Sequence, residues 1–299
     1  MTWTILYLLV IQLILPAIFI YSLWKGEFHS KLEWMIHLLS TTMIILWLFQ
    51  SGRWDWIGYY FRFIWLILLI IAIYRSWKKM RSLPFRIKLS GKQKLSIGIY
   101  LVLLFVFGMY NVFVISSYST QEKAIELSFP LKNGTYYIGQ GGNHVQMNYH
   151  NAYLPQKYAL DIVKLNNFGT RANGLYPKDL GNYTIYGDEL YSPCHGIVAE
   201  MRDHLPDLTP PESNSENPEG NYVAIICENE DAVIYIAHMK EGSVAVNKDE
   251  KVREGQKIGE IGNSGNTTEP HLHIHAEKEG KGVPMQFDGR FLVRNNLVR

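Results

Sequence analysis

Three histidines recur at alternate positions near the C-terminal end of the sequence. They lie in the run PHLHIH at residues 270–275, which contains His271, His273 and His275. In a β-strand alternate side chains share one face, so all three imidazoles would project to the same side. Neutral imidazole is a good zinc ligand, and a rigid strand places such ligands without ordering a loop. The spacing therefore favours metal binding or catalysis over a solvated polar face.

Two further groups that could do chemistry lie upstream. His238 ends the run YIAH, and Asp161 is the single acid in the apolar run YALDIV. Burying a lone carboxylate is costly unless it is paired or bound to a metal, so Asp161 needs a partner. Two candidate partners, His144 and His150, precede it in the sequence.

The segment before the histidine run, GEIGNSGNTT at residues 259–268, is rich in Gly and Asn. Glycine adopts positive φ cheaply, so such a turn can approach a ligand closely. It lacks the GK[ST] ending of a phosphate-binding loop and precedes a strand and not a helix. The sequence also has no HExxH motif, so a mechanism with a glutamate base on that helix does not apply.

Taken together, these residues resemble the M23 (lysostaphin/LytM-type) zinc metallopeptidases. The resemblance covers roughly residues 139–288, about half of the chain. Its most specific part is the run KVREGQKIG at 251–259, followed by the Gly/Asn turn and the His-x-His pair.

The resemblance implies an antiparallel β-sheet domain with one Zn²⁺ per chain. By resemblance the metal ligands are His150, Asp161 and His273, which leave an open tetrahedral position for water. His238 and His271 match the two remaining family histidines, which would activate the water or stabilise the oxyanion.

Two positions depart from the family pattern. The usual spacing from the first His to the Asp is four residues, whereas His150 and Asp161 are eleven apart, so the segment around 154–156 must loop out. His144 is the rival ligand, and the shorter loop favours His150. His275 stands where related sequences often have Glu, so it supports a metal ligand, faces the substrate or is simply solvated.

The elements that must position these residues are short β-rich runs broken by Gly, Pro and Asn, which predict an antiparallel sheet. Residues 165–189 and 202–220 are expected to be long surface loops. Cys194 and Cys227 could form one disulfide, but two separate buried residues is the favoured interpretation. The predicted strands are 158–163, 196–201, 222–228, 232–238, 257–261 and 271–277.

The first 118 residues are apolar, and their only acids are Glu27, Glu33 and Asp55. Apolar stretches of about 17–24 residues are long enough to cross a bilayer. Such stretches predict about four spans, although the second and third are short enough to form a re-entrant hairpin instead. The spans are expected at 3–23, 34–50, 57–74 and 95–118.

Lys and Arg set the expected orientation of these spans. The connection between the third and fourth spans is strongly basic and is expected inside, whereas the connection around 51–56 is nearly uncharged and suits the outside. Both termini then lie outside. The basic residues of the inside connection are Arg75, Lys78, Lys79, Arg81, Arg86, Lys88, Lys92 and Lys94.

The sequence thus predicts a transmembrane helical region (1–118), a linker (119–134) and an extracellular peptidase domain (135–299). The expected function is a multi-pass membrane zinc endopeptidase that cuts peptidoglycan peptides. A non-catalytic regulator of other wall enzymes is the alternative, and a transporter or sensor is disfavoured by the scarcity of charge in the spans. The expected partners are the substrate, the lipid bilayer and an unidentified membrane protein. The acidic second half argues against nucleic acid.

Overall fold

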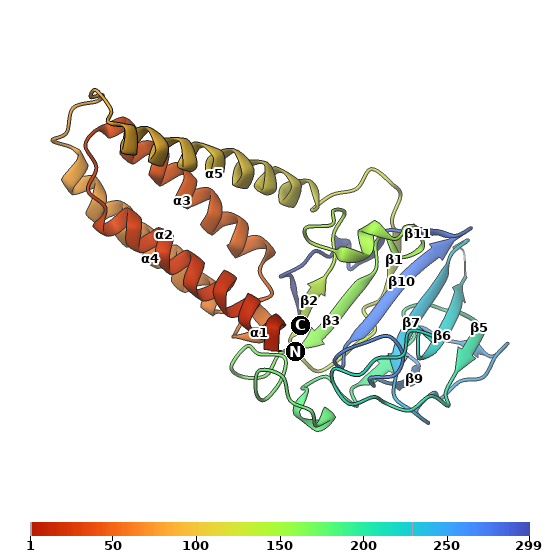
Figure 1. Ribbon diagram of the computed structural model, residues 1–299. Coiled ribbons are helices and arrows are strands. Elements are labelled where there is room, and N and C mark those ends of the chain that lie inside the picture. Colours follow the sequence, from red (N-terminus) through yellow and green to blue (C-terminus); the bar gives the residue numbers. More distant parts are fainter. Residues whose placement is uncertain (1, 229) are drawn as a thin grey trace. The chain divides into compact units, whose positions relative to one another are not determined.

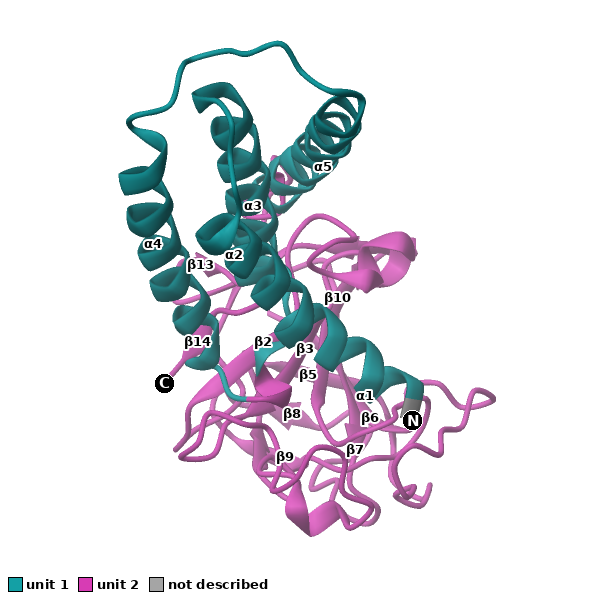
Figure 2. Cartoon of the chain, turned by 60° about the vertical axis from the view of Figure 1, so that its left-hand side comes forward, with its two compact units in different colours: residues 1–54, 58–115 teal, residues 55–57, 116–299 magenta. Residues whose placement is uncertain are grey.

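The computed structural model describes residues 2–228 and 230–299. The chain divides into two compact units, shown in Figure 2. Unit 1 comprises Met1–Trp54 and Gly58–Ile115, and unit 2 comprises Asp55–Ile57 and Ser116–Arg299. Three residues from the helical half of the sequence therefore belong to the β-rich unit.

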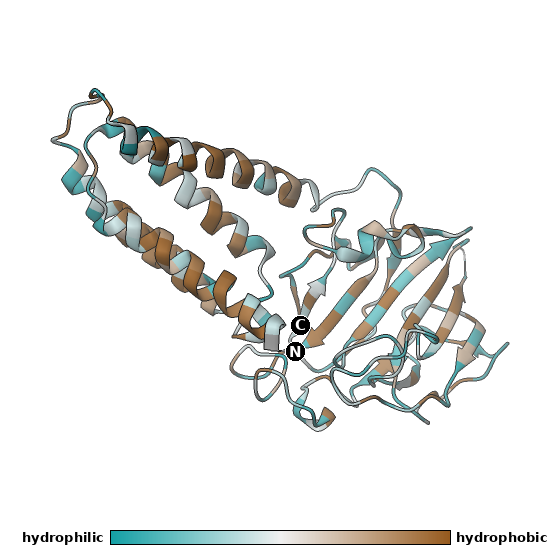
Figure 3. Ribbon diagram, in the orientation of Figure 1, coloured by the Kyte–Doolittle hydropathy of each residue, from teal (hydrophilic) through white to brown (hydrophobic). Residues whose placement is uncertain are grey.

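Unit 1 is built from the predicted apolar segments, which form helices (Figure 1). Three segments are long and apolar enough to cross a membrane: Trp3–Lys25, Lys31–Ser51 and Gly91–Ser116. Figure 3 shows apolar residues predominating along these helices. The expected apolar helical region is confirmed, with three candidate spans by this criterion. The elements are α1 (Thr2–Leu9), a π-helical turn (Val10–Ile14), α2 (Leu15–Lys25), α3 (Lys31–Ser51), α4 (Phe61–Met80) and α5 (Gly91–Ser116).

Helix α4 differs from the expected third span in where it begins. The prediction placed the start at residue 57, but Trp54–Trp56 form a 3-10 turn and the helix begins at Phe61. Gly58 has a φ of 117°, a backbone conformation that side chains with a Cβ rarely adopt, so the helix cannot extend through it. Basic residues stand near both ends of α4: Arg62, Arg75, Lys78 and Lys79.

Polar side chains in the helical unit find partners on neighbouring helices. Asn111 of α5 donates hydrogen bonds to the carbonyls of Met43 in α3 (2.9 Å) and Phe107 (2.7 Å). Gln50 of α3 donates to the Asn111 side-chain oxygen at 3.1 Å. Polar groups in hydrocarbon must be satisfied within the protein, so these bonds link α3 to α5.

Unit 2 is organised around a nine-stranded sheet with the order β14-β2-β3-β10-β7-β6-β5-β8, and β11 also pairs with β10. All of the pairings in this sheet are antiparallel. Its strands are β2 (Tyr136–Gln140), β3 (Leu160–Lys164), β5 (Gly196–Arg202), β6 (Asn221–Cys227), β7 (Val233–Met239), β8 (Lys251–Val252), β10 (Leu272–Lys278), β11 (Lys281–Val283) and β14 (Leu297–Val298).

Two smaller sheets complete the unit. The first pairs β1 (Ile125–Leu127), β12 (Met285–Phe287) and β13 (Arg290–Phe291), and the second pairs β4 (Glu189–Tyr191) with β9 (Lys257–Glu260). Ile125 and Leu127 are buried in the main core, so the predicted linker 119–134 contains part of the folded unit.

The six predicted strands correspond to β3, β5, β6, β7, β9 and β10, with ends that differ by at most two residues. Alternation along β10 explains how the sheet serves both core and site. Leu272, Ile274 and Ala276 lie in the hydrophobic core, so the histidines between them face the opposite side of the sheet. The long segments predicted as loops, 165–189 and 202–220, contain almost no regular strand.

Cys194 and Cys227 form a disulfide, with Cα atoms 5.8 Å apart and a sequence separation of 33. The interpretation favoured from sequence, two separate buried residues, is wrong. It failed because Cys227 ends β6 while Cys194 lies in the turn before β5, and the sequence does not reveal that these strands pair.

Replacing both Cys194 and Cys227 by Ala is expected to lower the free energy of unfolding by about 2–4 kcal/mol, since the cross-link restricts the unfolded chain. Pulse proteolysis of unit 2 in urea, performed on the full-length protein in detergent, measures the change. Wild-type protein with reductant serves as the control and should match the variant. Equal stability of all three samples would contradict the expectation.

Candidate metal centre

The register of β10 places the central histidine beside a carboxylate. β10 lies between β3 and β7, and His273 pairs with Asp161 on one side and with Ala237 on the other. His238 follows Ala237 directly. Three strands that are distant in sequence therefore bring His273, Asp161 and His238 to one place.

Asp161 stands at the centre of a tight cluster. Its Oδ1 atom lies 3.0 Å from His150 Nε2 and 3.0 Å from His273 Nδ1. The potential ligand atoms of His150, Asp161 and His273 all lie within 4.8 Å of one another, and all three residues are buried. Two imidazole nitrogens and a carboxylate oxygen form a donor set that Zn²⁺ prefers.

His150 reaches this cluster from a short 3-10 turn, Tyr149–Ala152. The turn is anchored by Asn148, whose side chain accepts a hydrogen bond from the His150 amide and donates to the Ala159 carbonyl at 3.0 Å. A second turn, Leu154–Gln156, takes up the rest of the chain before β3. The extra residues between His150 and Asp161 thus fold outward as two turns.

His144, the rival ligand, is placed differently. Its Nδ1 accepts a hydrogen bond from the Gln146 amide at 3.2 Å. Among the described residues it belongs to neither of the groups whose ligand atoms converge. The geometry therefore favours His150.

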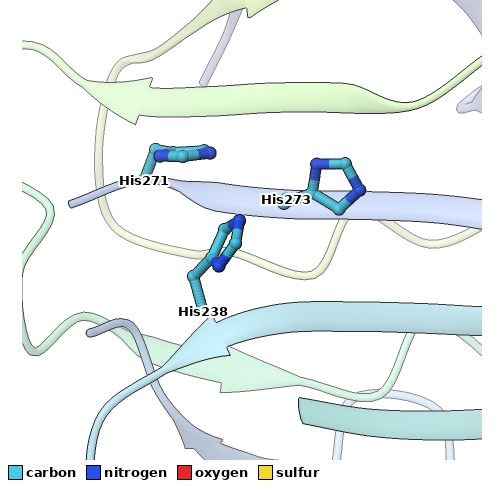
Figure 4. Close-up of side chains that lie close together, drawn as sticks. All are labelled: His238, His271 and His273. Carbon is cyan, nitrogen blue, oxygen red and sulfur yellow. The ribbon is translucent and has the colours of Figure 1, made fainter. Parts of the chain in front are cut away.

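A second group of converging side chains consists of His238, His271 and His273 (Figure 4). The two groups share His273. His271 Nε2 lies 3.5 Å from Asp161 Oδ1, so the two groups meet at the same carboxylate. One continuous site contains all five residues that the sequence singled out.

His238 and His271 are held in the same tautomer by main-chain carbonyls. The Nδ1–H of His238 donates to the Ser264 carbonyl at 2.9 Å, and that of His271 donates to the Glu269 carbonyl at 2.8 Å. Each Nε2 atom is then left as a proton acceptor. His238 also has a φ of 60°, an uncommon conformation for a residue with a Cβ, and such strain is often found at functional sites.

Charge within the site favours the forms that bind a cation. Burial alone would raise the pKa of Asp161, but His150 and His271 hold it well below its usual range. Burial lowers the pKa of His273 and, further, that of His238. Burial would lower the pKa of His271, but the Asp161 carboxylate raises it above its usual value, so the form that binds a cation is favoured at Asp161, His273 and His238 and not at His271.

His275 is buried and not solvated, with 4% of its surface exposed. Its ring stacks on Tyr235, with centroids 4.9 Å apart, and its Nδ1 lies 3.0 Å from His273 Nε2. With a metal ion on His273 Nδ1, the proton of this ring would lie on Nε2 and would be donated to His275 Nδ1. Such a contact fixes the tautomer and orientation of a metal-ligating imidazole.

A cavity of about 230 Å³ opens onto the cluster and is lined by His150, His238 and His273, among others. Tyr149 also lines it and donates a hydrogen bond to Asp161 Oδ2 at 3.1 Å. Sequence reasoning missed Tyr149, although its position next to His150 could have signalled it. The cavity leaves one side of the cluster accessible.

The Gly/Asn turn approaches the segment before β6 backbone to backbone. A Cβ on Gly265 would lie 2.3 Å from the Gly220 amide nitrogen, and one on Gly220 would lie 2.2 Å from the Ser264 carbonyl. Both glycines also have positive φ, so each position requires the absence of a side chain. This close approach holds the Ser264 carbonyl that orients His238.

Comparison with known proteins confirms the resemblance over part of the chain. Residues 183–285 match the model of peptidase family M23. That range includes His238, His271 and His273 but begins after His150 and Asp161. The prediction that His150 and Asp161 are metal ligands is therefore supported by the geometry described above and not by this match. No curated protein matches the sequence.

Several solved structures are similar at low identity. A zinc-containing peptidase from Vibrio cholerae has 21% identity and a TM-score of 0.31, and the match covers 54% of this chain and 39% of that chain. The catalytic domain of lysostaphin from Staphylococcus simulans has 22% identity and a TM-score of 0.23, with 35% and 75% covered. A SpoIIIAH–SpoIIQ complex has 12% identity and a TM-score of 0.35, with 52% and 95% covered. This chain thus spans well under half of the Vibrio peptidase.

Purified full-length protein is expected to bind about one zinc ion per chain, as a site with three protein ligands does. Replacing His150, Asp161 or His273 by Ala should lower zinc affinity by more than about 100-fold. Loss of a residue that only supports a ligand typically costs about 10–100-fold, and loss of the ligand itself should cost more. Competition with a chromogenic chelator measures the affinity.

His144→Ala is the matched control and should leave zinc affinity unchanged. His275→Ala removes only the support of His273 and should weaken binding by about 10–100-fold. A loss of zinc in His144→Ala together with retention in His150→Ala would reverse the ligand assignment.

Proposed function

We propose that this protein is a membrane-anchored zinc endopeptidase that hydrolyses peptide bonds of bacterial peptidoglycan. The observation that carries the proposal is the convergence of His150, Asp161 and His273 within 4.8 Å, with two further histidines beside them. The M23 match of residues 183–285 supports peptidase chemistry and a wall-peptide substrate.

In this proposal His150 Nε2, Asp161 Oδ1 and His273 Nδ1 hold the metal. When bound, zinc supplies Lewis acidity that polarises the scissile carbonyl and a water molecule. Three protein ligands leave one tetrahedral position open, which is the arrangement of catalytic and not of structural zinc sites. Tyr149 and His275 keep the carboxylate and the imidazole in place.

His238 and His271 move protons and stabilise charge. Their Nδ1–H groups are held by the carbonyls of Ser264 and Glu269, so each Nε2 faces the site as an acceptor. One of them takes the proton of the attacking water, and the other, once protonated, donates to the developing oxyanion or the leaving amine. The fixed rings need no reorientation during the reaction.

Several observations support an extracellular peptidase domain. The disulfide between Cys194 and Cys227 is typical of an oxidising compartment. The basic connection between α4 and α5 is typical of the cytoplasmic side. Both observations support an extracellular position for the residues after α5.

The residues that unit 2 contains support a proposal of four membrane crossings. Asp55–Ile57 and the residues from Ser116 onward belong to one compact unit, so they lie on the same side of the membrane. The chain must cross an even number of times between them, and only α4 and α5 are available. Since α5 is a candidate span, α4 must also cross, with its basic residues near the two interfaces. Four spans are therefore proposed.

Hydrolysis is tested with purified full-length protein and isolated wall peptides. Ala at His238 or His271 is expected to lower kcat by about 100–1,000-fold, because each variant lacks a proton carrier or oxyanion donor. Zinc content should be unchanged, because neither residue is a proposed ligand. Liquid chromatography of the released peptides gives the rates.

The matched control is His144→Ala, which should hydrolyse like the wild type. Chelator should abolish hydrolysis, and zinc should restore it. If zinc-loaded wild-type protein cuts no wall peptide, the alternative of a non-catalytic regulator of wall enzymes replaces the peptidase proposal.

Membrane topology is tested by labelling single cysteines in intact cells with an impermeant maleimide, to which the disulfide-bonded native cysteines are silent. Lys123→Cys is expected to react in intact cells. Glu27→Cys and Ser82→Cys should react only after permeabilisation, which also serves as the control for reactivity. Labelling of only one of Glu27→Cys and Ser82→Cys in intact cells would show that α4 does not cross, because α3 and α4 together return the chain to the same side.

A further inference from the structure

A segment from the membrane half of the sequence is built into the peptidase unit. Asp55–Ile57, between α3 and α4, belongs to unit 2. The Asp55 carbonyl accepts a hydrogen bond of 2.9 Å from the Arg171 amide. Trp56 is 8% exposed and stacks on Tyr176, with ring centroids 5.4 Å apart and planes at 16°. The segment therefore packs against the long loop 165–189.

Trp56 covers a buried cation. The Arg171 guanidinium carbon lies 3.5 Å from the centroid of the Trp56 ring, and Arg171 is 1% exposed. Its Nη1 atom is buried and has no hydrogen-bond partner among the described residues. A desolvated guanidinium is stabilised by the face of an aromatic ring. Trp56 is thus part of what makes the burial of Arg171 tolerable.

Arg171 in turn holds the loop that precedes the histidine strand. Its Nε donates to Glu269 Oε2 at 2.7 Å, and its Nη2 lies 2.6 Å from the same oxygen. Tyr176 donates to the Thr268 carbonyl at 2.9 Å. Arg171 and Tyr176, which both contact Trp56, therefore bind the adjacent residues Glu269 and Thr268 of this loop.

The clamped loop sets the ring of His271. The Glu269 carbonyl accepts the Nδ1–H of His271 at 2.8 Å, and Thr267 Oγ1 donates to the same carbonyl at 2.8 Å. A displacement of Glu269 would release the His271 ring from its fixed tautomer and direction. Misplacement of a catalytic group by about 1 Å can cost about 100-fold in rate.

We infer that Trp56 is a positioning residue: through Arg171, Tyr176 and Glu269 it fixes the orientation of His271. The inference rests on the proposed function, because it assigns to the connection between α3 and α4 control over the same site. The peptidase is fully active only while Trp56 packs against Arg171 and Tyr176. A single span would suffice to anchor the protein. The role of Trp56 gives a reason for the additional helices α3 and α4, because the connection between them carries Trp56.

The test uses the full-length chain with Trp56→Ala, Trp56→Phe and Arg171→Met. Trp56→Ala and Arg171→Met should lower kcat by about 10–100-fold with KM and zinc content unchanged, because His271 is misplaced but the ligands are not. Trp56→Phe retains a ring over the guanidinium and should keep most of the activity. Tyr191→Ala is the matched control, since its ring lies under Lys132 at 3.7 Å, away from this loop.

A second readout does not depend on activity. Hydrogen exchange at residues 267–271 should become faster in Trp56→Ala than in Trp56→Phe or Tyr191→Ala, since the loop loses its clamp. Unchanged exchange and unchanged kcat in Trp56→Ala would overturn the inference, as would loss of zinc with global unfolding. If wild-type protein is inactive but exchange is faster in Trp56→Ala, the proposed peptidase activity is refuted, whereas the coupling of Trp56 to the loop at residues 267–271 is supported.

Discussion

The Asp161 carboxylate is the charge around which the histidines of unit 2 are arranged. It is 8% exposed, and a carboxylate so placed must be compensated by partners or a cation. One oxygen lies between His150 and His273, and the other accepts a hydrogen bond from Tyr149. The antiparallel register of β3, β10 and β7 creates this arrangement. It pairs His273 of β10 with Asp161 of β3 on one side and with Ala237 of β7 on the other, and His238 follows Ala237. A shift of one residue in β10 would turn the histidines into the core.

Supports of the centre extend well beyond the ligands. Three imidazoles near the centre are each held by a main-chain carbonyl or a stacked ring: His238 by Ser264, His271 by Glu269 and His275 by Tyr235. Those carbonyls belong to the Gly/Asn turn and to the loop clamped by Arg171. The proposed chemistry therefore depends on loops that reach back to Asp55–Ile57, in the first fifth of the sequence.

The sequence predicted the features that depend on local periodicity. Alternation of apolar residues and histidines in 271–277 indicated both the strand and its functional face, and the lone acid in β3 marked Asp161. Pairing between distant residues was not predictable in this way. The bond between Cys194 and Cys227, the burial of Ile125 in the core and the packing of Trp56 on Arg171 all depend on strand order and loop paths. Local turn chemistry accounts for the late start of α4, since the positive φ of Gly58 interrupts an otherwise apolar run.

The central claim is that one cation lies between His150, Asp161 and His273. Anomalous diffraction at the zinc edge from crystals of the zinc-loaded full-length protein tests it most directly. The account predicts one peak within about 2.0–2.2 Å of Asp161 Oδ1, His150 Nε2 and His273 Nδ1. A peak held by His238, His271 and His273, with Asp161 out of reach, would contradict it.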